Sequence, residues 1–140
     1  MGIRLLILTA GIQEYTPGNQ IDPQGRSYID DLPVKLEERI PDIHVDVCHT
    51  VESAKDLIGE ADVAFGVIVP ELFARAKKLK LILSPQAGPK AGYYHRALIE
   101  SDVIVTNASG IYSDHIGAHI MAFVLAFSRG LQGYISQQIR

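Results

Sequence analysis

The stretch DVAFGVIVPELFARAKKLKLIL, residues 62–83, decides the fold. The mostly apolar residues 62–67 predict a strand, and an apolar run at residues 81–83 predicts another. Between them a helix is expected from Pro70 to about Lys78, since proline suits the first position of a helix. Continuous apolar runs are typical of strands buried on both faces, so the stretch indicates a strand–helix–strand unit of a parallel sheet.

The same alternation extends outward from this unit. Residues 3–8 form another apolar run, whereas residues 43–47 alternate apolar and polar side chains, which indicates a strand at or near a sheet edge. Further elements are predicted as helices at residues 28–40, 51–58 and about 94–100, and as a strand at residues 103–105. Thr50 is expected to cap the second helix and Gly59 to follow it at the C′ position.

Strands alternating with helices imply an α/β fold with helices on both faces of a parallel sheet. We expect a flavodoxin-like, doubly wound sheet of five strands in the order 2-1-3-4-5. Ligands of such sheets bind beyond the carboxyl ends of the strands, which selects the loops at residues 9–15, 67–70 and 84–92. Residues 11–26 are rich in Gly, Pro, Gln and Asp and indicate an irregular loop.

The last helix, opened by Tyr112 or Ser113, does not fit a free-standing domain. From Ile120 to Phe127 its residues are apolar around the whole circumference, and one sheet face covers only one side of a helix. A second domain or a partner subunit must cover the rest, unless the small residues tolerate water. After Gly130 the pattern weakens, and no clear terminal element is expected.

Composition narrows the class of protein. The 140 residues suit one domain, and the net charge of −3 offers no basic field for nucleic acid or for an anionic membrane. The longest apolar stretch is too short to span a bilayer, and no secretory leader is expected. The single cysteine, Cys48, has no internal partner and is expected to be a buried, inert thiol. These features favour a cytoplasmic protein.

The five histidines do not indicate a metal site. His44, His49 and His95 are expected to face solvent. His115 and His119 stand four residues apart on one helix, which is a metal-ligand spacing, but no Glu follows the first of them. Packing or a hydrogen bond at the end of a helix is the preferred interpretation, and no metal is expected.

Two segments, LKLILSPQAG at residues 79–88 and LIESDVIVTNASG at residues 98–110, together with His119 in an apolar helix, resemble the D-2-hydroxyacid dehydrogenases. The resemblance implies a flavodoxin-like, substrate-side domain over residues 1–110. It also implies that residues 111–140 form a crossing helix, which leads to a Rossmann coenzyme domain absent from this sequence. A homodimer through the helix Asp114 to Arg129 is implied as well.

The resemblance also assigns substrate-binding residues. In the family, backbone N–H groups of the loop after the fourth strand hold the carboxylate of a small 2-keto or 2-hydroxy acid. The matching residues are Gln86, Ala87 and Gly88, and Ile111 and Tyr112 match the segment that lines the cleft. This sequence departs from the family pattern at four positions, which are Gln86 for Gly, Pro89 in place of an N–H donor, Lys90 at or near Asp, and Ala118 for Glu.

The coenzyme implied for the full-length enzyme is NAD or NADP, but the fingerprint G-x-G-x-x-G is absent from these 140 residues. In the family the Arg, Glu and His of the reaction come from the second domain. No catalytic and no cofactor-binding residue is therefore expected in this chain, which should be inactive alone. The alternative is a stand-alone, dimeric flavodoxin-like domain that binds a small carboxylate or another anion without catalysis.

Overall fold

The computed structural model describes residues 2–10 and 28–138. The irregular loop expected at residues 11–26, and most of the expected ligand loop at residues 9–15, lie outside the described residues. The chain divides into two compact units, Met1–Ala108 and Ser109–Arg140.

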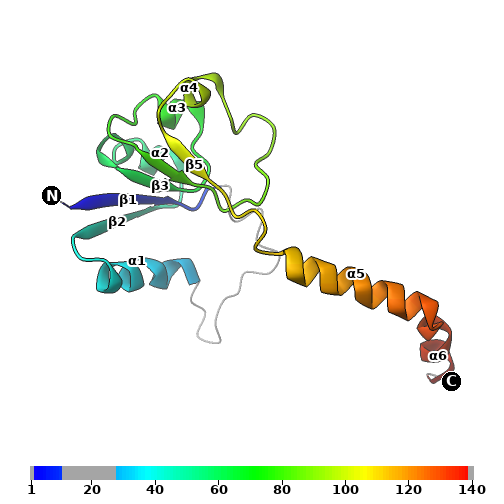
Figure 1. Ribbon diagram of the computed structural model, residues 1–140. Helices are drawn as coiled ribbons and strands as arrows, with labels where there is room; N and C mark the ends of the chain where they lie inside the picture. Colours follow the sequence, from blue (N-terminus) through cyan, green and yellow to red (C-terminus); the bar gives the residue numbers. More distant parts are fainter. Residues whose placement is uncertain (1, 11–27, 139–140) are drawn as a thin grey trace. The chain divides into compact units, whose positions relative to one another are not determined.

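The first unit is built on one parallel sheet of five strands (Figure 1). The strands are β1 (Ile3–Leu8), β2 (Ile43–Cys48), β3 (Val63–Phe65), β4 (Leu81–Leu83) and β5 (Ile104–Thr106). Their spatial order is β2-β1-β3-β4-β5, and every neighbouring pair is parallel. The predicted flavodoxin-like order 2-1-3-4-5 is therefore confirmed, with β2 at a sheet edge as expected.

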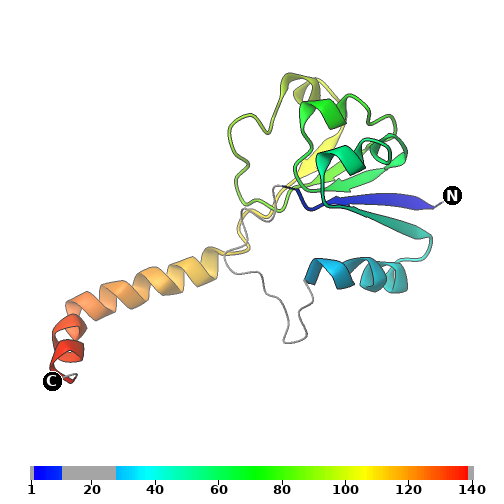
Figure 2. The ribbon, with the colours of Figure 1, turned by 180° about the vertical axis from the view of Figure 1, so that it is seen from behind.

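Helices cover both faces of the sheet, as Figure 1 and the view from behind in Figure 2 show. They are α1 (Tyr28–Arg39), α2 (Val51–Ala54), a short 3₁₀ helix η1 (Ile58–Glu60), α3 (Pro70–Phe73) and α4 (Arg96–Ile99). Helix α1 lies on one face beside β1 and β2, and the later helices lie on the other. This division is what right-handed crossovers produce when the chain reverses direction along the sheet.

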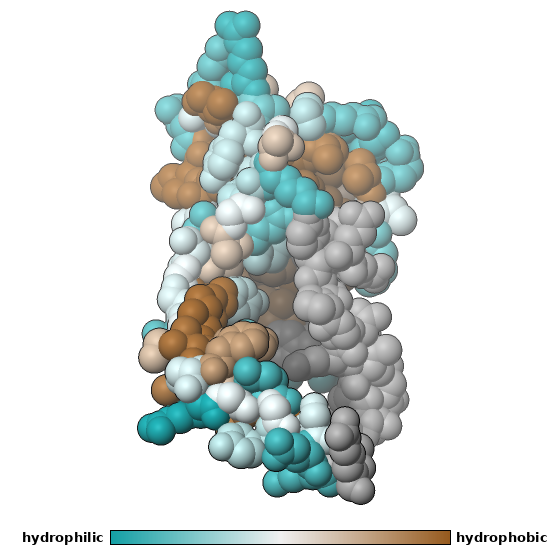
Figure 3. Space-filling view, turned by 90° about the vertical axis from the view of Figure 1, so that its right-hand side faces the viewer, coloured by the Kyte–Doolittle hydropathy of each residue, from teal (hydrophilic) through white to brown (hydrophobic). Residues whose placement is uncertain are grey.

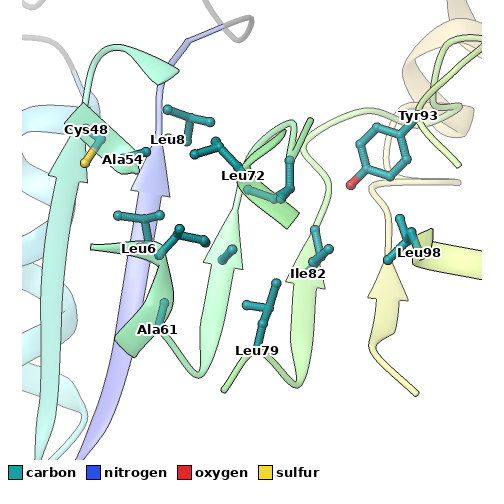
Figure 4. Packing of buried hydrophobic residues seen from close by; sticks show 13 residues of the cluster. Leu6, Leu8, Cys48, Ala54, Ala61, Leu72, Leu79, Ile82, Tyr93 and Leu98 are labelled. Atoms are coloured by element: carbon teal, nitrogen blue, oxygen red, sulfur yellow. The ribbon is translucent and has the colours of Figure 1, made fainter. Parts of the chain in front are cut away.

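Each face of the sheet has its own apolar core, because successive side chains of a strand point to opposite faces. On the α1 face, Leu5, Ile7 and Val45 pack with Leu32 and Leu36 of the helix. The larger core lies under the other helices, as the close view in Figure 4 shows. Its fully buried members include Leu6, Leu8, Ile58, Leu72 and Ile82.

Three helical predictions need correction. The helix expected over residues 51–58 ends at Ala54, and a turn separates it from η1. Helix α3 was expected to reach Lys78 but ends at Phe73, because the N–H groups of Arg75 and Ala76 bond three residues back and tighten the chain into turns. Gly59 lies inside η1 and not at a C′ position. The predicted cap at Thr50 is confirmed, since its hydroxyl accepts a hydrogen bond from the Ser53 N–H at 3.1 Å.

The second unit consists of α5 (Ser113–Ser128) and α6 (Leu131–Gln138). Helix α6 corrects the expectation that no terminal element follows Gly130, whose φ of 66° separates the two helices. No residue of α5 is buried, and its large apolar side chains are each more than half exposed. Hydrophobic side chains reach the molecular surface in Figure 3. No helix among the described residues is long and apolar enough to cross a membrane.

Candidate functional site

The carboxyl edge of the sheet is where a ligand of this fold is expected. Of the three loops selected from the sequence, residues 67–70 read VIVP and carry no polar side chain, and Ile68 is buried. At the end of β1, the buried Thr9 uses its hydroxyl on its own neighbours, the His49 Nδ1 at 3.0 Å and the Cys48 carbonyl at 3.4 Å. Residues 11–15 of the first loop lie outside the described residues, so the loop after β4 is the candidate site that can be described.

Hydrogen bonds at Gln86 hold this loop in place. Its N–H donates to the hydroxyl of Ser84, a buried residue directly after β4, at 3.3 Å. Its carbonyl accepts the N–H of Ala108 at 3.1 Å, which ties the loop to the segment that follows β5. The backbone of the predicted substrate residues thus starts from a fixed point on the sheet edge.

Beyond that point the loop presents free donors. Ala87 and Gly88 are exposed, and their N–H groups donate to no residue that the structure describes. A Cβ built on Gly88 would meet no atom within 4 Å, so the space beside this peptide is open. Successive unpaired backbone N–H groups suit an anion such as a carboxylate. Pro89 ends the run because it has no N–H.

The remaining predicted site residues belong to the other unit. Ile111 and Tyr112 directly precede α5, where Tyr112 occupies the N-cap position without a side-chain hydrogen bond to the helix. Both side chains are more than half exposed. The structure thus gathers Gln86, Ala87 and Gly88 in one loop, and it places Ile111 and Tyr112 side by side in the second unit.

Two residues beside the loop were missed or misjudged. His95 was expected to face solvent, but its Nδ1 accepts the Leu98 N–H at 3.3 Å and caps α4, while its ring packs on Phe73 with centroids 5.1 Å apart. Tyr93, not singled out from the sequence, is only 7% exposed and belongs to the main core. The one available sequence signal was the adjacent pair Tyr93 and Tyr94. Because the loop that carries them has no periodic pattern, the sequence does not show which of the two rings is buried.

The fingerprint G-x-G-x-x-G does not occur in these 140 residues. The twelve glycines of the sequence include no pair two positions apart, so the close approach of backbone to a pyrophosphate that G-x-G-x-x-G provides cannot be made here. Among the described residues, no group of three or more His, Cys, Asp or Glu side chains is placed to hold a metal ion. The exposed backbone amides of this loop are groups that could bind an anion.

No protein-family model matches the sequence, and no curated protein matches it. Its fold is similar to the crystal structure of a D-isomer specific 2-hydroxyacid dehydrogenase family protein from Aeromonas salmonicida subsp. salmonicida A449, with a TM-score of 0.63 and 22% sequence identity. The match covers 99% of this chain and 39% of that chain. The resemblance noted in the sequence is thus confirmed at the level of the fold, over a part of a longer protein.

Proposed function

We propose that this chain is the substrate-side part of an NAD(P)-dependent D-2-hydroxyacid dehydrogenase, which interconverts a 2-keto acid and a D-2-hydroxy acid. The observation that carries the proposal is the fold likeness over nearly the whole chain to 39% of a protein of that family. The motifs at residues 79–88 and 98–110 support the same assignment independently of the fold. Fold likeness alone would not support a reaction, because one fold serves many functions.

In this proposal the unpaired N–H groups of Ala87 and Gly88 bind the substrate carboxylate, and Gln86 anchors them to the sheet edge. Charge-assisted bonds from amides to a carboxylate are stronger than neutral ones. The family resemblance also assigns Ile111 and Tyr112 to the binding of the acid. The hydride donor, NAD or NADP, and the residues that move the proton lie outside these 140 residues, so this chain binds and orients the acid without transferring a hydride.

The proposed partners follow from the same assignment. A coenzyme domain adjoins the second unit, and a homodimer forms through α5 between Asp114 and Arg129. The uniform exposure of the apolar side chains of α5 supports this part of the proposal, since an apolar helix of this length is ordinarily covered. Neither nucleic acid nor membrane is a proposed partner, and the proposed location is the cytoplasm.

The test of the site uses pyruvate and its methyl ester, which is larger by one methyl group and has no carboxylate charge. The backbone amide resonances of Ala87 and Gly88 are followed by NMR while each compound is added. We expect pyruvate to shift both resonances in a saturable way and methyl pyruvate to leave them in place. Equal shifts with both compounds, or shifts confined to other residues, would show that this loop is not a carboxylate site.

The alternative function is a stand-alone dimeric domain that binds a small anion without catalysis. No two glycines of the sequence stand two positions apart, as the dinucleotide fingerprint requires, and this favours the alternative for the chain acting alone. An assay of the natural gene product with NADH or NADPH and a series of 2-keto acids separates the two proposals. Reduction of any 2-keto acid supports the dehydrogenase, and anion binding without reduction supports the alternative.

A further inference from the structure

The loop from β4 to α4 carries a single fixed charge. It reads SPQAGPKAGYYH at residues 84–95 and contains no Asp, Glu or Arg, so Lys90 is its one residue that is charged at every pH near neutrality. Lys90 is exposed. The charge that the loop itself brings to the candidate carboxylate site is therefore positive, which favours an anion.

A turn connects the backbone of Lys90 to the core. The Lys90 carbonyl oxygen accepts the N–H of Tyr93 at 3.1 Å, and Gly92 between them has a φ of 88°. This hydrogen bond, with a positive φ at the third of four residues, is typical of a type II β-turn, which favours glycine at that position. Tyr93 is only 7% exposed and belongs to the main core. The turn therefore holds the Lys90 backbone at a fixed place on the fold.

The chain between Lys90 and the free amides is short. Gln86 is bonded to the sheet edge through Ser84 and Ala108, and Gly88 lies midway between Gln86 and Lys90. Two residues of fully extended chain span at most about 7 Å. A lysine ammonium group stands on a flexible four-carbon stem, which can cover that distance. The ammonium group of Lys90 can therefore reach an anion bound at the Gly88 N–H, where the space beside the peptide is open.

We propose that Lys90 is a substrate-binding residue, whose ammonium group pairs with the same carboxylate that the Ala87 and Gly88 N–H groups bind. The inference rests on the proposed function of this loop and adds a charged side chain to its backbone donors. Lysine is a flexible point charge with several donors, so it adjusts to a carboxylate that the amides orient. The family pattern has Asp at or near this position, so this chain reverses the sign of the charge beside the carboxylate.

The contribution of Lys90 to binding has a signature in its dependence on salt. Exposed ion pairs contribute modestly, because water and dissolved ions screen the two charges. The amide donors are neutral and lie against the carboxylate, so salt affects their share of the binding less. A charged contact therefore weakens as salt is added, whereas a lysine that only shapes the loop would affect binding equally at all salt concentrations.

The experiment compares wild type with Lys90→Gln, which removes the charge but keeps a long polar side chain. Pyruvate affinity is measured from the Ala87 and Gly88 amide resonances at about 0.02 M and about 0.5 M NaCl, on either side of physiological screening. Lys90→Gln should bind pyruvate about three- to fivefold more weakly in the low salt and less than about twofold more weakly in the high salt. Lys90→Arg keeps the charge and should stay within about twofold of wild type.

The matched control is Lys77→Gln, which removes the same charge from an exposed lysine that precedes β4, beyond the opposite end of that strand. It should bind pyruvate as wild type does in both salts, and both glutamine variants should keep the wild-type urea midpoint. Equal losses in Lys77→Gln and Lys90→Gln would overturn the inference, since net charge alone would then explain them. A loss in Lys90→Gln that does not change with salt would overturn it as well.

The same measurements separate this inference from the proposed function on which it rests. If wild type shows no saturable shift at Ala87 and Gly88, the carboxylate site and the role of Lys90 fail together. If wild type binds pyruvate and Lys90→Gln binds it equally well in the low salt, the backbone amides bind the acid without Lys90, and this inference alone is overturned.

Discussion

At the scale of single residues, Gly66 directly follows β3 and admits no side chain. Its φ is 131°, and a Cβ there would lie 2.5 Å from the carbonyl oxygen of Leu8 in the neighbouring strand. The clash could be relieved only if β1 and β3 moved apart, because the Leu8 carbonyl oxygen belongs to the backbone. Gly66→Ala should therefore lower the free energy of unfolding by at least about 2 kcal/mol, as measured by urea denaturation.

Gly59→Ala is the matched control for this change. A Cβ at Gly59 would meet its nearest heavy atom, the Arg75 carbonyl oxygen, at an ordinary contact distance of 3.5 Å. We expect a change of less than about 1 kcal/mol in either direction. Equal stability of Gly66→Ala and Gly59→Ala would show that the Leu8 carbonyl oxygen of β1 does not lie as close to Gly66 as the structure places it.

Asp62, at the amino edge of the sheet, makes the stability of the fold depend on pH in the acid range. The Arg4 backbone N–H and then the Lys80 ammonium group hold the pKa of its carboxyl below the usual 3.8. A lowered pKa in the folded state contributes stability that is fully present above about pH 4 and is lost as the pH falls through the folded value. Asp62→Asn should keep a hydrogen-bond acceptor for Arg4 but flatten the decline of stability below pH 4.

The control for Asp62 is Asp102→Asn, since Asp102 is exposed in the turn after α4. Urea midpoints measured at pH 7 and at successive values below pH 4 make the comparison. Wild type and Asp102→Asn should lose stability in parallel on acidification, and Asp62→Asn should lose less. A parallel decline in all three proteins would show that the ionised Asp62 carboxylate contributes nothing to the fold.

Sequence patterns predicted the surroundings of a single residue only where one local interaction determines them. The buried Cys48 and the capping Thr50 were foreseen, because a strand end and a helix start constrain those side chains locally. His95 was misjudged, since its surroundings come from Phe73 and from the first turn of α4, and neither is visible in the polarity of its neighbours. Tyr93 was missed for the same reason.

At the scale of elements, strand order could be predicted and helix length could not. Apolar runs mark buried strands, and right-handed crossovers leave few orders for five of them. The end of α3 depends instead on where the chain must turn so that Leu79 becomes buried, which periodicity does not encode. Helix α6 was missed because Gly133 and the polar residues after it weaken its apolar pattern.

Helix α5 gives a prediction about association. If it is the dimer interface, as proposed, a charge on its apolar surface should separate the subunits, because burying an unpaired ammonium group is costly. Phe127→Lys should shift the protein toward monomer in sedimentation equilibrium by tenfold or more in dissociation constant. Ser128→Lys adds the same charge at the neighbouring position, the last residue of the helix, and should change the constant less than threefold.

A monomeric wild-type protein at high concentration would refute the proposed interface. So would equal effects of the two lysine variants, since net charge alone would then account for the shift. Circular dichroism of both variants provides the necessary check that α5 remains helical.

At the scale of the whole molecule, the sequence predicted the candidate loop but not the hydrogen bonds that hold it in place. Residues 86–88 were assigned through a family resemblance, and the structure adds the bonds to Ser84 and Ala108 that tie this loop to two strand ends. The bond between Gln86 and Ala108 joins segments more than twenty residues apart, and a pattern read along one stretch cannot show it. Ile111 and Tyr112 remain predicted site residues in the second unit.

The division of labour in the proposed enzyme leads to a final prediction. This chain has a loop with unpaired amides but no glycine pair for a dinucleotide, so binding of the acid and hydride transfer should be separable. The isolated chain should bind pyruvate yet leave NADH absorbance unchanged over hours, with no quenching or enhancement of NADH fluorescence.

The matched control is a protein in which the same 140 residues are followed by their natural continuation. That protein should oxidise NADH or NADPH with a 2-keto acid and should lose most of its affinity for the acid when Gly88 is replaced by Pro, which removes one amide donor. NADH oxidation by the isolated chain would mean that its own residues form a coenzyme site, and a natural protein without reductase activity would leave anion binding as the function.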